Sequence, residues 1–137
     1  MKEEFNPIQE VLDDLRNGRT VIGIDDADRE NEGDLILSAE HVTTESINFM
    51  AKHGRGLICM PMEGKRLAEL DIHAMVNESE DPHRTAFTVS VDAKHGITTG
   101  ISAQDRARTV LVLIDKNATS QDLVRPGHIF PLRVKEG

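Results

Sequence analysis

Ten consecutive residues near the start of the chain, positions 25–34, hold six carboxylates and one arginine. The carboxylates belong to Asp25, Asp26, Asp28, Glu30, Glu32 and Asp34, and the arginine is Arg29. Like charges at this density repel one another unless a cation or an arginine offsets them. A solvated turn rich in Asp, Asn and Gly is the alternative interpretation. We favour a site for a hard cation, because packing gives a surface loop no reason to hold so many carboxylates.

The spacing of these residues narrows the choice of cation. An EF-hand calcium loop counted from Asp28 places Gly33 at the turn, but it puts Ala39 where a bidentate glutamate is required. The apolar runs 21–24 and 35–37 predict flanking strands, whereas an EF-hand needs helices. The remaining candidate is a magnesium-like site of one or two carboxylates, completed by water and substrate oxygens. Arg29 would hold a carboxylate or a substrate oxygen in its planar fork.

Length and composition bound the class of protein. A chain of 137 residues fits one domain with a single core. The net charge of −8 and the scattered lysines and arginines disfavour a nucleic-acid partner. No apolar run approaches the roughly 20 residues of a membrane helix. The first four residues lack the apolar segment of a secretory signal and Cys59 is the lone cysteine, so we expect a cytoplasmic protein.

Four helices are predicted along the chain. The first has Asn6 as its cap, begins at Pro7 and stops at Gly18. The second is capped by Thr44 and is ended by Gly54. Along the sequence, the first helix precedes the two strands that flank the acidic loop, and the second helix follows them.

The third and fourth helices follow later in the chain. The third is short, from about residue 65 to residue 70. The fourth begins with a capping box made by Ser102 and Asp105. Its residues expected to face the core are Ala107, Val110, Leu111 and Ile114.

The extended segments complete the fold prediction. A buried strand is expected over 57–60, stopping at Pro61, and a half-buried strand over 87–91 with its Phe and Val side chains inward. The segment 123–132 contains Pro126 and Pro131, which predicts a turn followed by a short edge or extended segment. Together the elements predict an α+β fold, in which a mixed β-sheet is layered with helices.

Several of these segments resemble one known family. Residues 26–34 resemble the signature of 3,4-dihydroxy-2-butanone 4-phosphate synthase, a lyase of riboflavin biosynthesis. Four further motifs resemble that family in the family's order, at residues 54–59, 87–91, 96–106 and 125–133. The resemblance covers essentially the whole chain, but only about the first two thirds of the family's domain.

The resemblance implies a fold, a reaction and partners. The fold would be the α+β fold of that family. The reaction would convert D-ribulose 5-phosphate to L-3,4-dihydroxy-2-butanone 4-phosphate and formate, with Mg²⁺ or Mn²⁺ as cofactor. Both metals accept oxygen ligands. Members of the family work as homodimers with the active site at the subunit interface, so a homodimer is expected here.

The resemblance also implies roles for single residues. Glu30 matches the family's metal-binding glutamate and would take part in catalysis, while Arg29 and Asp34 match positions that contact the sugar phosphate. These three residues all belong to the acidic loop and the strand that follows it.

Three more positions match the family further along the chain. His128 matches a histidine needed for catalysis, and imidazole is suited to moving protons near neutral pH. Cys59 and Thr99 match residues near the substrate, although a free cysteine also packs readily as a small core residue. Asp105 and Arg106 are most simply assigned to the helix start, although the family pattern keeps them close to the active site.

The departure from the family is at the end of the chain. There the family continues with a glycine-rich stretch whose histidine is the second metal ligand and whose arginine and threonine hold the phosphate. The resemblance therefore implies that 1–137 is a single domain of this type, incomplete at its C-terminal end, and inactive when isolated. Two alternatives are an inactive short relative that binds sugar phosphate or metal as a regulatory module, and a plain acidic metal-binding module.

Overall fold

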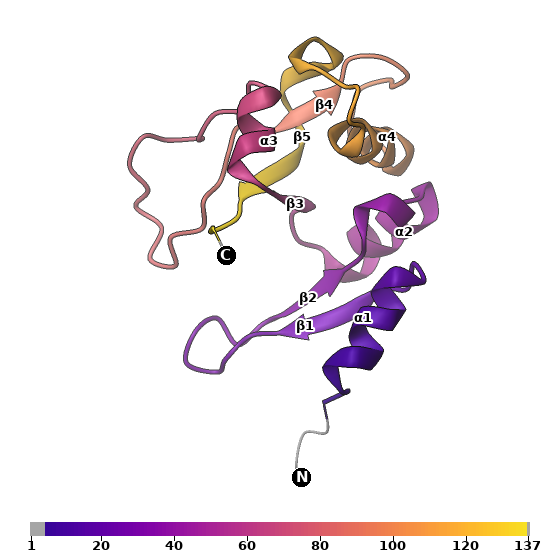
Figure 1. The fold of residues 1–137 in the computed structure, drawn as a ribbon, viewed down its shortest axis with the longest axis vertical. Coiled ribbons are helices and arrows are strands. Elements are labelled where there is room, and N and C mark those ends of the chain that lie inside the picture. Colours follow the sequence, from indigo (N-terminus) through magenta and orange to yellow (C-terminus); the bar gives the residue numbers. More distant parts are fainter. Residues whose placement is uncertain (1–4, 137) are drawn as a thin grey trace. The chain divides into compact units, whose positions relative to one another are not determined.

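The computed structural model describes residues 5–136, so the segment considered for a secretory signal, residues 1–4, lies outside them. Two compact units make up the chain, one ending at Val42 and the other beginning at Thr43. Figure 1 shows the elements of each unit. Within the described residues, no helix has the length and apolar character needed to cross a membrane.

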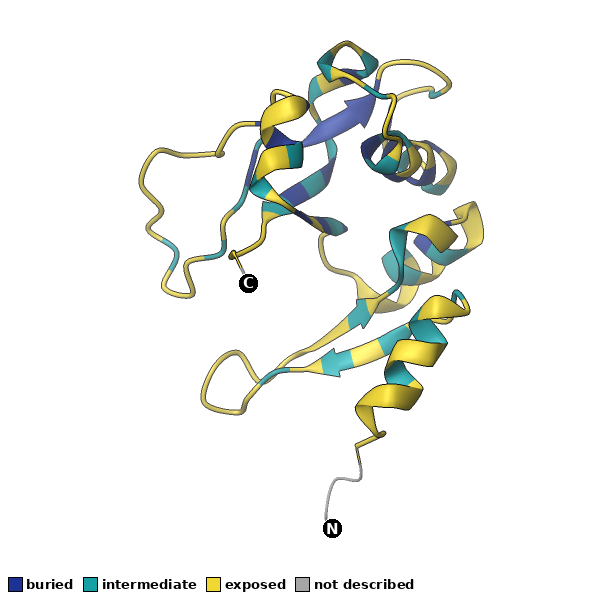
Figure 2. Cartoon of the chain, in the orientation of Figure 1, coloured by how far each residue is buried: buried dark blue, intermediate teal, exposed yellow. Residues whose placement is uncertain are grey.

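The first unit is a helix followed by a β-hairpin. It contains α1 (Ile8–Arg16), β1 (Val21–Ile24), β2 (Gly33–Ile36) and a 3₁₀ turn, Ala39–His41. Strands β1 and β2 pair antiparallel, with Val21 opposite Ile36 and Ile24 opposite Gly33. The hairpin confirms the two predicted strands on either side of the acidic loop. Figure 2 shows the loop between them as exposed.

The ends of α1 correct one prediction and confirm another. Asn6 is not the cap: Pro7 occupies that position, and the Asn6 side-chain amide instead donates to Glu10 at 3.4 Å. The backbone of Pro7 is extended, with ψ of 139°, so the helix begins one residue later than predicted. Gly18 does end the helix, because its φ of +74° takes the chain out of the helical region.

The second unit is a three-stranded mixed sheet with helices. Its strands are β3 (Cys59–Met62), β4 (Val91–Ala93) and β5 (Leu123–Arg133), in the spatial order β3-β5-β4. Strand β5 runs parallel to β3 and antiparallel to β4. The helices are α2 (Thr44–Phe49), continued by a π-helical turn over Met50–Gly54, α3 (Gly64–Glu69) and α4 (Ala103–Ile114), and a 3₁₀ turn covers Ser120–Asp122. Figure 2 shows the buried residues concentrated in this sheet and in α4.

Strand β5 is the main departure from the predicted fold. The segment is extended, as one of the two predicted alternatives had it, but the predicted turn and short edge placement are wrong, since β5 is an 11-residue strand at the centre of the sheet. Pro126 is tolerated because the register breaks there: Val91 pairs with Ile129 but Asp92 pairs with Val124, so residues 125–128 form a bulge. Pro131 lacks an N–H but still takes part in the hydrogen bonding of the sheet, because its carbonyl accepts from the backbone N–H of Thr88 at 3.1 Å.

The predicted strand over 87–91 is also wrong in its extent and its inward face. Only Val91 belongs to β4, while Phe87 and Thr88 form isolated bridges. Val91 is buried as expected, but Thr88 and Ser90 are buried in place of Phe87 and Val89, which are only half-buried, so the inward face is wrong over 87–90 alone. Hydrogen bonding explains this, because the Thr88 hydroxyl donates to the Pro131 carbonyl at 2.7 Å and the Ser90 hydroxyl accepts from the Gly127 N–H at 3.1 Å.

Two shorter elements differ from prediction at their ends. Strand β3 begins at Cys59, two residues later than predicted, and continues through Pro61 to Met62 instead of stopping at the proline. The cap of α2 is Thr43, whose side chain forms a capping box with Ser46, so the predicted cap Thr44 is the first helical residue. These differences are shifts of one or two residues at the ends of elements that the sequence predicts.

The core-facing side of α4 is rotated from the predicted one. Ala107 and Val110 are buried as expected, but Leu111 is 40% exposed and Ile114 only half-buried. Thr109 and Leu113 are fully buried in their place. The capping box is also absent: Ser102 accepts from the backbone N–H of Asp105, but the Asp105 carboxylate turns inward. An inward residue 105 places residues 109 and 113 on the same helical face.

Candidate active-site residues

The acidic loop is organised by the carboxylate of Asp25, at the end of β1. One Asp25 oxygen accepts from the backbone N–H of Glu30 at 3.0 Å, and the other accepts from that of Glu32 at 2.9 Å. These hydrogen bonds, that of Glu32 first, lower the pKa of Asp25 from its usual value, and the charge of Arg29 adds to the effect. Asp25 therefore stays ionised and fixes the backbone on which Glu30 is carried.

Arg29 and Glu30 are neighbours in space as well as in sequence. The Arg29 guanidinium lies 3.4 Å from Asp25 Oδ2 and 3.9 Å from Glu30 Oε1. The Arg29 side chain is 54% exposed and that of Glu30 34% exposed. The expected pairing of Arg29 with a carboxylate is thus present, and the guanidinium still has donors that face solvent. Asp34 is exposed on β2, opposite Gly23 of β1.

The donor set of this loop suits magnesium but does not form a complete cage. Among the described residues, no group of three or more His, Cys, Asp or Glu side chains is placed to hold a metal ion. Mg²⁺ is often bound through one or two carboxylates, with water and substrate oxygens completing the octahedron. Glu30 fits the role of such a carboxylate, since it is partly exposed on a loop whose backbone is fixed by Asp25.

In the second unit, His128 is bound to a buried carboxylate. His128 lies in the bulge of β5, and its backbone N–H donates to Asp92 Oδ1 at 2.8 Å. Its ring Nδ1 lies 2.8 Å from Asp92 Oδ2. The Asp92 side chain is 6% exposed and that of His128 38% exposed. The imidazole is therefore held by Asp92 on one side while part of the ring reaches the surface.

A tight loop, residues 96–100, lies against this pair. Gly100 has φ of +97°, and a side-chain carbon there would overlap the Asp92 carboxylate and lie 2.7 Å from His128 Nδ1. Asp105 holds the loop by accepting from the Gly100 N–H at 2.9 Å and from the Thr98 N–H and hydroxyl at 3.1 and 2.8 Å. Only glycine fits this close approach.

The Asp105 carboxyl keeps its charge in this setting. Burial acts to raise its pKa, but the hydrogen bonds from Gly100 and Thr98 outweigh burial, and the pKa of Asp105 is lowered overall. The side chain that was assigned to the helix start thus fixes a loop beside His128.

Cys59 and Thr99 are placed differently. Thr99 is exposed within the tight loop, one residue before Gly100. Cys59 is half-buried at the start of β3, paired with Phe130 of β5. Of the predicted residues, the structure brings Thr99 and His128 into one neighbourhood and Arg29, Glu30 and Asp34 into another. The sequence analysis did not identify Asp92 as a candidate. The feature that could have indicated it is a carboxylate in a segment that otherwise holds small and apolar residues, 87–93.

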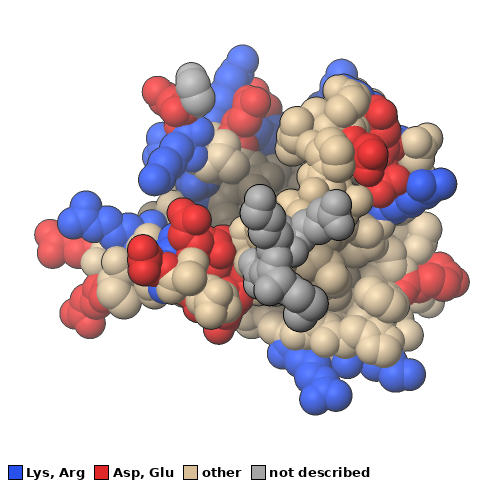
Figure 3. All heavy atoms as spheres, turned by 90° about the horizontal axis from the view of Figure 1, so that it is seen from below, with Lys and Arg blue, Asp and Glu red and all other residues tan. Residues whose placement is uncertain are grey.

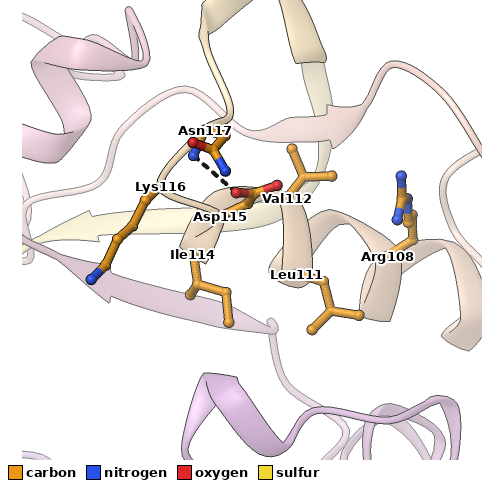
Figure 4. Close-up of a pocket in the computed structure, with 7 residues that line it drawn as sticks. All are labelled: Arg108, Leu111, Val112, Ile114, Asp115, Lys116 and Asn117. Carbon is orange, nitrogen blue, oxygen red and sulfur yellow. Dashed lines mark hydrogen bonds between the residues drawn. The ribbon is translucent and has the colours of Figure 1, made fainter.

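Two surface features lie apart from these residues. A hollow of about 560 Å³ lies at the C-terminal end of α4 and is lined by none of the predicted site residues. Figure 4 shows its lining, with the Asn117 backbone N–H donating to Asp115 at 2.9 Å. Figure 3 shows acidic side chains gathered in small clusters, with basic side chains scattered between them, among the described residues of one face.

Comparison with known sequences gives a consistent picture. The sequence model of the family described as 3,4-dihydroxy-2-butanone 4-phosphate synthase matches residues 9–137. The riboflavin biosynthesis protein RibBA of Aquifex aeolicus is 54% identical over 136 residues, which are 98% of this chain and 34% of that protein. The 3,4-dihydroxy-2-butanone 4-phosphate synthase of Pseudomonas aeruginosa is 55% identical over 133 residues, 97% of this chain and 36% of that protein. The chain thus spans about a third of the length of these curated relatives.

Solved structures agree with this result. A crystal structure of 3,4-dihydroxy-2-butanone 4-phosphate synthase in complex with two magnesium ions matches with a TM-score of 0.94 and 48% identity, over 97% of this chain and 62% of that one. RibBX, a two-domain 3,4-dihydroxy-2-butanone 4-phosphate synthase from A. baumannii, matches with a TM-score of 0.89 and 42% identity, over 95% of this chain and 38% of that one. The α+β fold expected from the sequence is confirmed.

Proposed function

The chain belongs to the 3,4-dihydroxy-2-butanone 4-phosphate synthase family, and we propose on that basis that it forms part of the lyase of riboflavin biosynthesis. This lyase converts D-ribulose 5-phosphate to L-3,4-dihydroxy-2-butanone 4-phosphate and formate. The observation that carries the proposal is the uninterrupted family match over residues 9–137, joined to a TM-score of 0.94 at 48% identity. The same match spans both compact units, which supports the proposal that 1–137 belongs to a single domain of this type.

Glu30 is the proposed metal ligand. A divalent metal is supported by the magnesium-bound relative and by the oxygen donors of the acidic loop. Mg²⁺, or Mn²⁺ in its place, would polarise a substrate carbonyl and stabilise the negative charge that develops after proton loss. Glu30 would take part in catalysis by holding the metal beside this charge.

Arg29 and Asp34 are the proposed contacts to the sugar phosphate. The Arg29 ion pairs of 3.4 and 3.9 Å are long and exposed, so its guanidinium can exchange a carboxylate partner for a substrate oxygen. Asp34 presents an exposed acceptor on β2 for a sugar hydroxyl. Thr99 and Cys59 are also proposed to contact the substrate, Thr99 through its exposed hydroxyl.

His128 is the proposed proton carrier. The reaction requires removal of a proton next to a carbonyl, and imidazole accepts protons near neutral pH. Nδ1 of His128 faces Asp92, so Nε2 is the nitrogen that would exchange the proton. We further propose a homodimer in the cytoplasm, and the lone Cys59 suits a reducing compartment.

The test is turnover by the full native polypeptide that contains this sequence. Uniformly ¹³C-labelled ribulose 5-phosphate is incubated with the protein and Mg²⁺, and formate is followed by ¹³C NMR. We expect formate and the four-carbon phosphate to form in equal amounts, and neither product to form when the metal is chelated. Substrate binding without formate release would instead favour the regulatory module, and metal binding that ignores the substrate would favour the plain acidic module.

A further inference from the structure

We propose that Asp92 is a positioning residue, which fixes the His128 imidazole in the tautomer that carries its proton on Nδ1. An ionised carboxylate can only accept hydrogen bonds, so a ring nitrogen 2.8 Å from Asp92 Oδ2 must carry a hydrogen. In the neutral ring the lone pair then lies on Nε2. The tautomer follows from this geometry with an ionised Asp92 carboxylate, while the use of Nε2 as a base rests on the function proposed above.

Asp92 also binds the backbone of His128, in addition to its ring. Asp92 Oδ1 accepts from the backbone N–H of His128 at 2.8 Å, so one carboxylate binds both ends of the residue. The neighbouring Gly127 N–H donates to Ser90, and a side-chain carbon at Gly127 would overlap the backbone of Val91 and Asp92. The bulge in β5 is therefore pressed against β4 with almost no freedom to shift.

Burial strengthens this arrangement. Asp92 is 4% exposed, and Gly100 approaches so closely that it covers the carboxylate and the Nδ1 side of the ring. A hydrogen bond shielded from water is stronger than an exposed one, and an unpaired charge there would be costly. Asp105 keeps this cover in place through its three hydrogen bonds to Thr98 and Gly100.

The chemical consequence concerns both forms of the ring. In the neutral form Asp92 leaves Nε2 free to accept a proton, and in the charged form its carboxylate stabilises the imidazolium. Replacement by asparagine keeps the size but offers one acceptor oxygen only. If that oxygen keeps the backbone N–H of His128, the amide NH₂ faces Nδ1 and favours the opposite tautomer.

The exposed pair of Asp71 and His73 supplies a matched control. His73 Nε2 lies 2.7 Å from Asp71 Oδ1, with side chains 76% and 64% exposed. Asp71→Asn removes an aspartate from a histidine in the same way as Asp92→Asn, but it does so on the open surface. It should leave the ring of His128 unchanged.

The experiment reads the tautomer directly. The chain is labelled with ¹⁵N, and long-range ¹H–¹⁵N spectra of the imidazoles are recorded at alkaline pH, with His128→Gln assigning the signals of His128. We expect a protonated Nδ1 and an unprotonated Nε2 in the unchanged chain and in Asp71→Asn, and a reversed or averaged pattern in Asp92→Asn. A protonated Nε2 on His128 in the unchanged chain overturns the proposal, whether or not Asp92→Asn folds.

Turnover separates this proposal from the proposed function. In the native polypeptide, Asp92→Asn should lower kcat for formate release by about 10²–10⁴-fold with KM nearly unchanged, the range that a misplaced acid–base group costs. Full activity of Asp92→Asn overturns the positioning role while leaving the lyase assignment intact. The expected tautomer without any formate release upholds the positioning of the ring and refutes the lyase.

Discussion

At the scale of single residues, carboxylates that organise backbone matter as much as those that face solvent. Asp25 and Asp105 each accept two or more hydrogen bonds from backbone N–H groups, and each has a lowered pKa. Glu30, the proposed metal ligand, depends on Asp25, and the loop beside His128 depends on Asp105. The chemistry of both neighbourhoods therefore rests on side chains that need not touch the substrate.

The lowered pKa of Asp105 predicts how stability depends on pH. A group whose pKa is lower in the folded than in the unfolded state stabilises the fold above its unfolded pKa. Its contribution is lost as the pH falls from about 4 through the folded pKa. Thermal unfolding of Asp105→Asn should therefore show a lower Tm at neutral pH and a smaller loss of Tm on acidification. If Tm falls as much on acidification in Asp105→Asn as in the unchanged protein, Asp105 is not the group responsible for the pH dependence.

Asp25 predicts the behaviour of the acidic loop. Asp25→Asn retains one acceptor oxygen, so only one of the Glu30 and Glu32 N–H groups can stay bound to it. We expect faster amide hydrogen exchange at one or both positions and roughly tenfold weaker Mg²⁺ binding, a cost in the range of a charged hydrogen bond. Asp122→Asn, in the second unit, is the control. Unaltered exchange at both amides would refute the organising role of Asp25.

At the scale of elements, the sequence predicts the helices and the first hairpin well because each has local signals. Gly18 ends α1, and the apolar runs around the acidic loop become β1 and β2. The length and central position of β5 could not be predicted, because prolines disfavour a central strand. Here a bulge opposite β4 accommodates Pro126, and the Pro131 carbonyl accepts a hydrogen bond from the Thr88 N–H. Asp92 could not be predicted either, because its partner, His128, lies 36 residues away in the sequence.

The rotated face of α4 can be tested by paired truncations. Leu113 is 1% exposed and Leu111 is 40% exposed on the same helix. Leu113→Ala should lower the free energy of unfolding by about 2–5 kcal/mol, as expected for a buried leucine. Leu111→Ala should cost less than about 1 kcal/mol. Chemical denaturation measures both values, and equal costs would contradict the observed face.

The tight loop beside His128 offers a second paired test. Gly100→Ala meets both a positive φ of +97° and the Asp92 carboxylate, whereas at Gly56 a side-chain carbon would meet nothing within 4 Å. The left-handed backbone alone costs an alanine about 1–2 kcal/mol, and the overlap adds to this cost. Circular dichroism melts should show a clear loss of Tm for Gly100→Ala and little change for Gly56→Ala. A Tm that is equal in the two variants would mean that Gly100 does not lie against Asp92.

At the scale of the whole molecule, each unit supplies a different chemical resource. The first carries the proposed metal and phosphate contacts, Glu30 and Arg29, and the second carries the proposed proton carrier His128 with Asp92. The acidic loop and His128 could be predicted from residue types and from the family resemblance. The buried Asp92 could not be assigned a role from the sequence, because that role depends on His128, which only the folded chain brings near.

The measurement that tests the central claim most directly is formate release from ribulose 5-phosphate in two matched variants of the native polypeptide. Glu30→Gln removes the proposed metal ligand, while Glu40→Gln removes an exposed glutamate from the 3₁₀ turn of the same unit. We predict that Glu40→Gln keeps the unchanged rate and that Glu30→Gln loses at least about 10²-fold, with a weaker response to added Mg²⁺. Equal rates in the two variants, or no formate from the unchanged protein, would contradict the account.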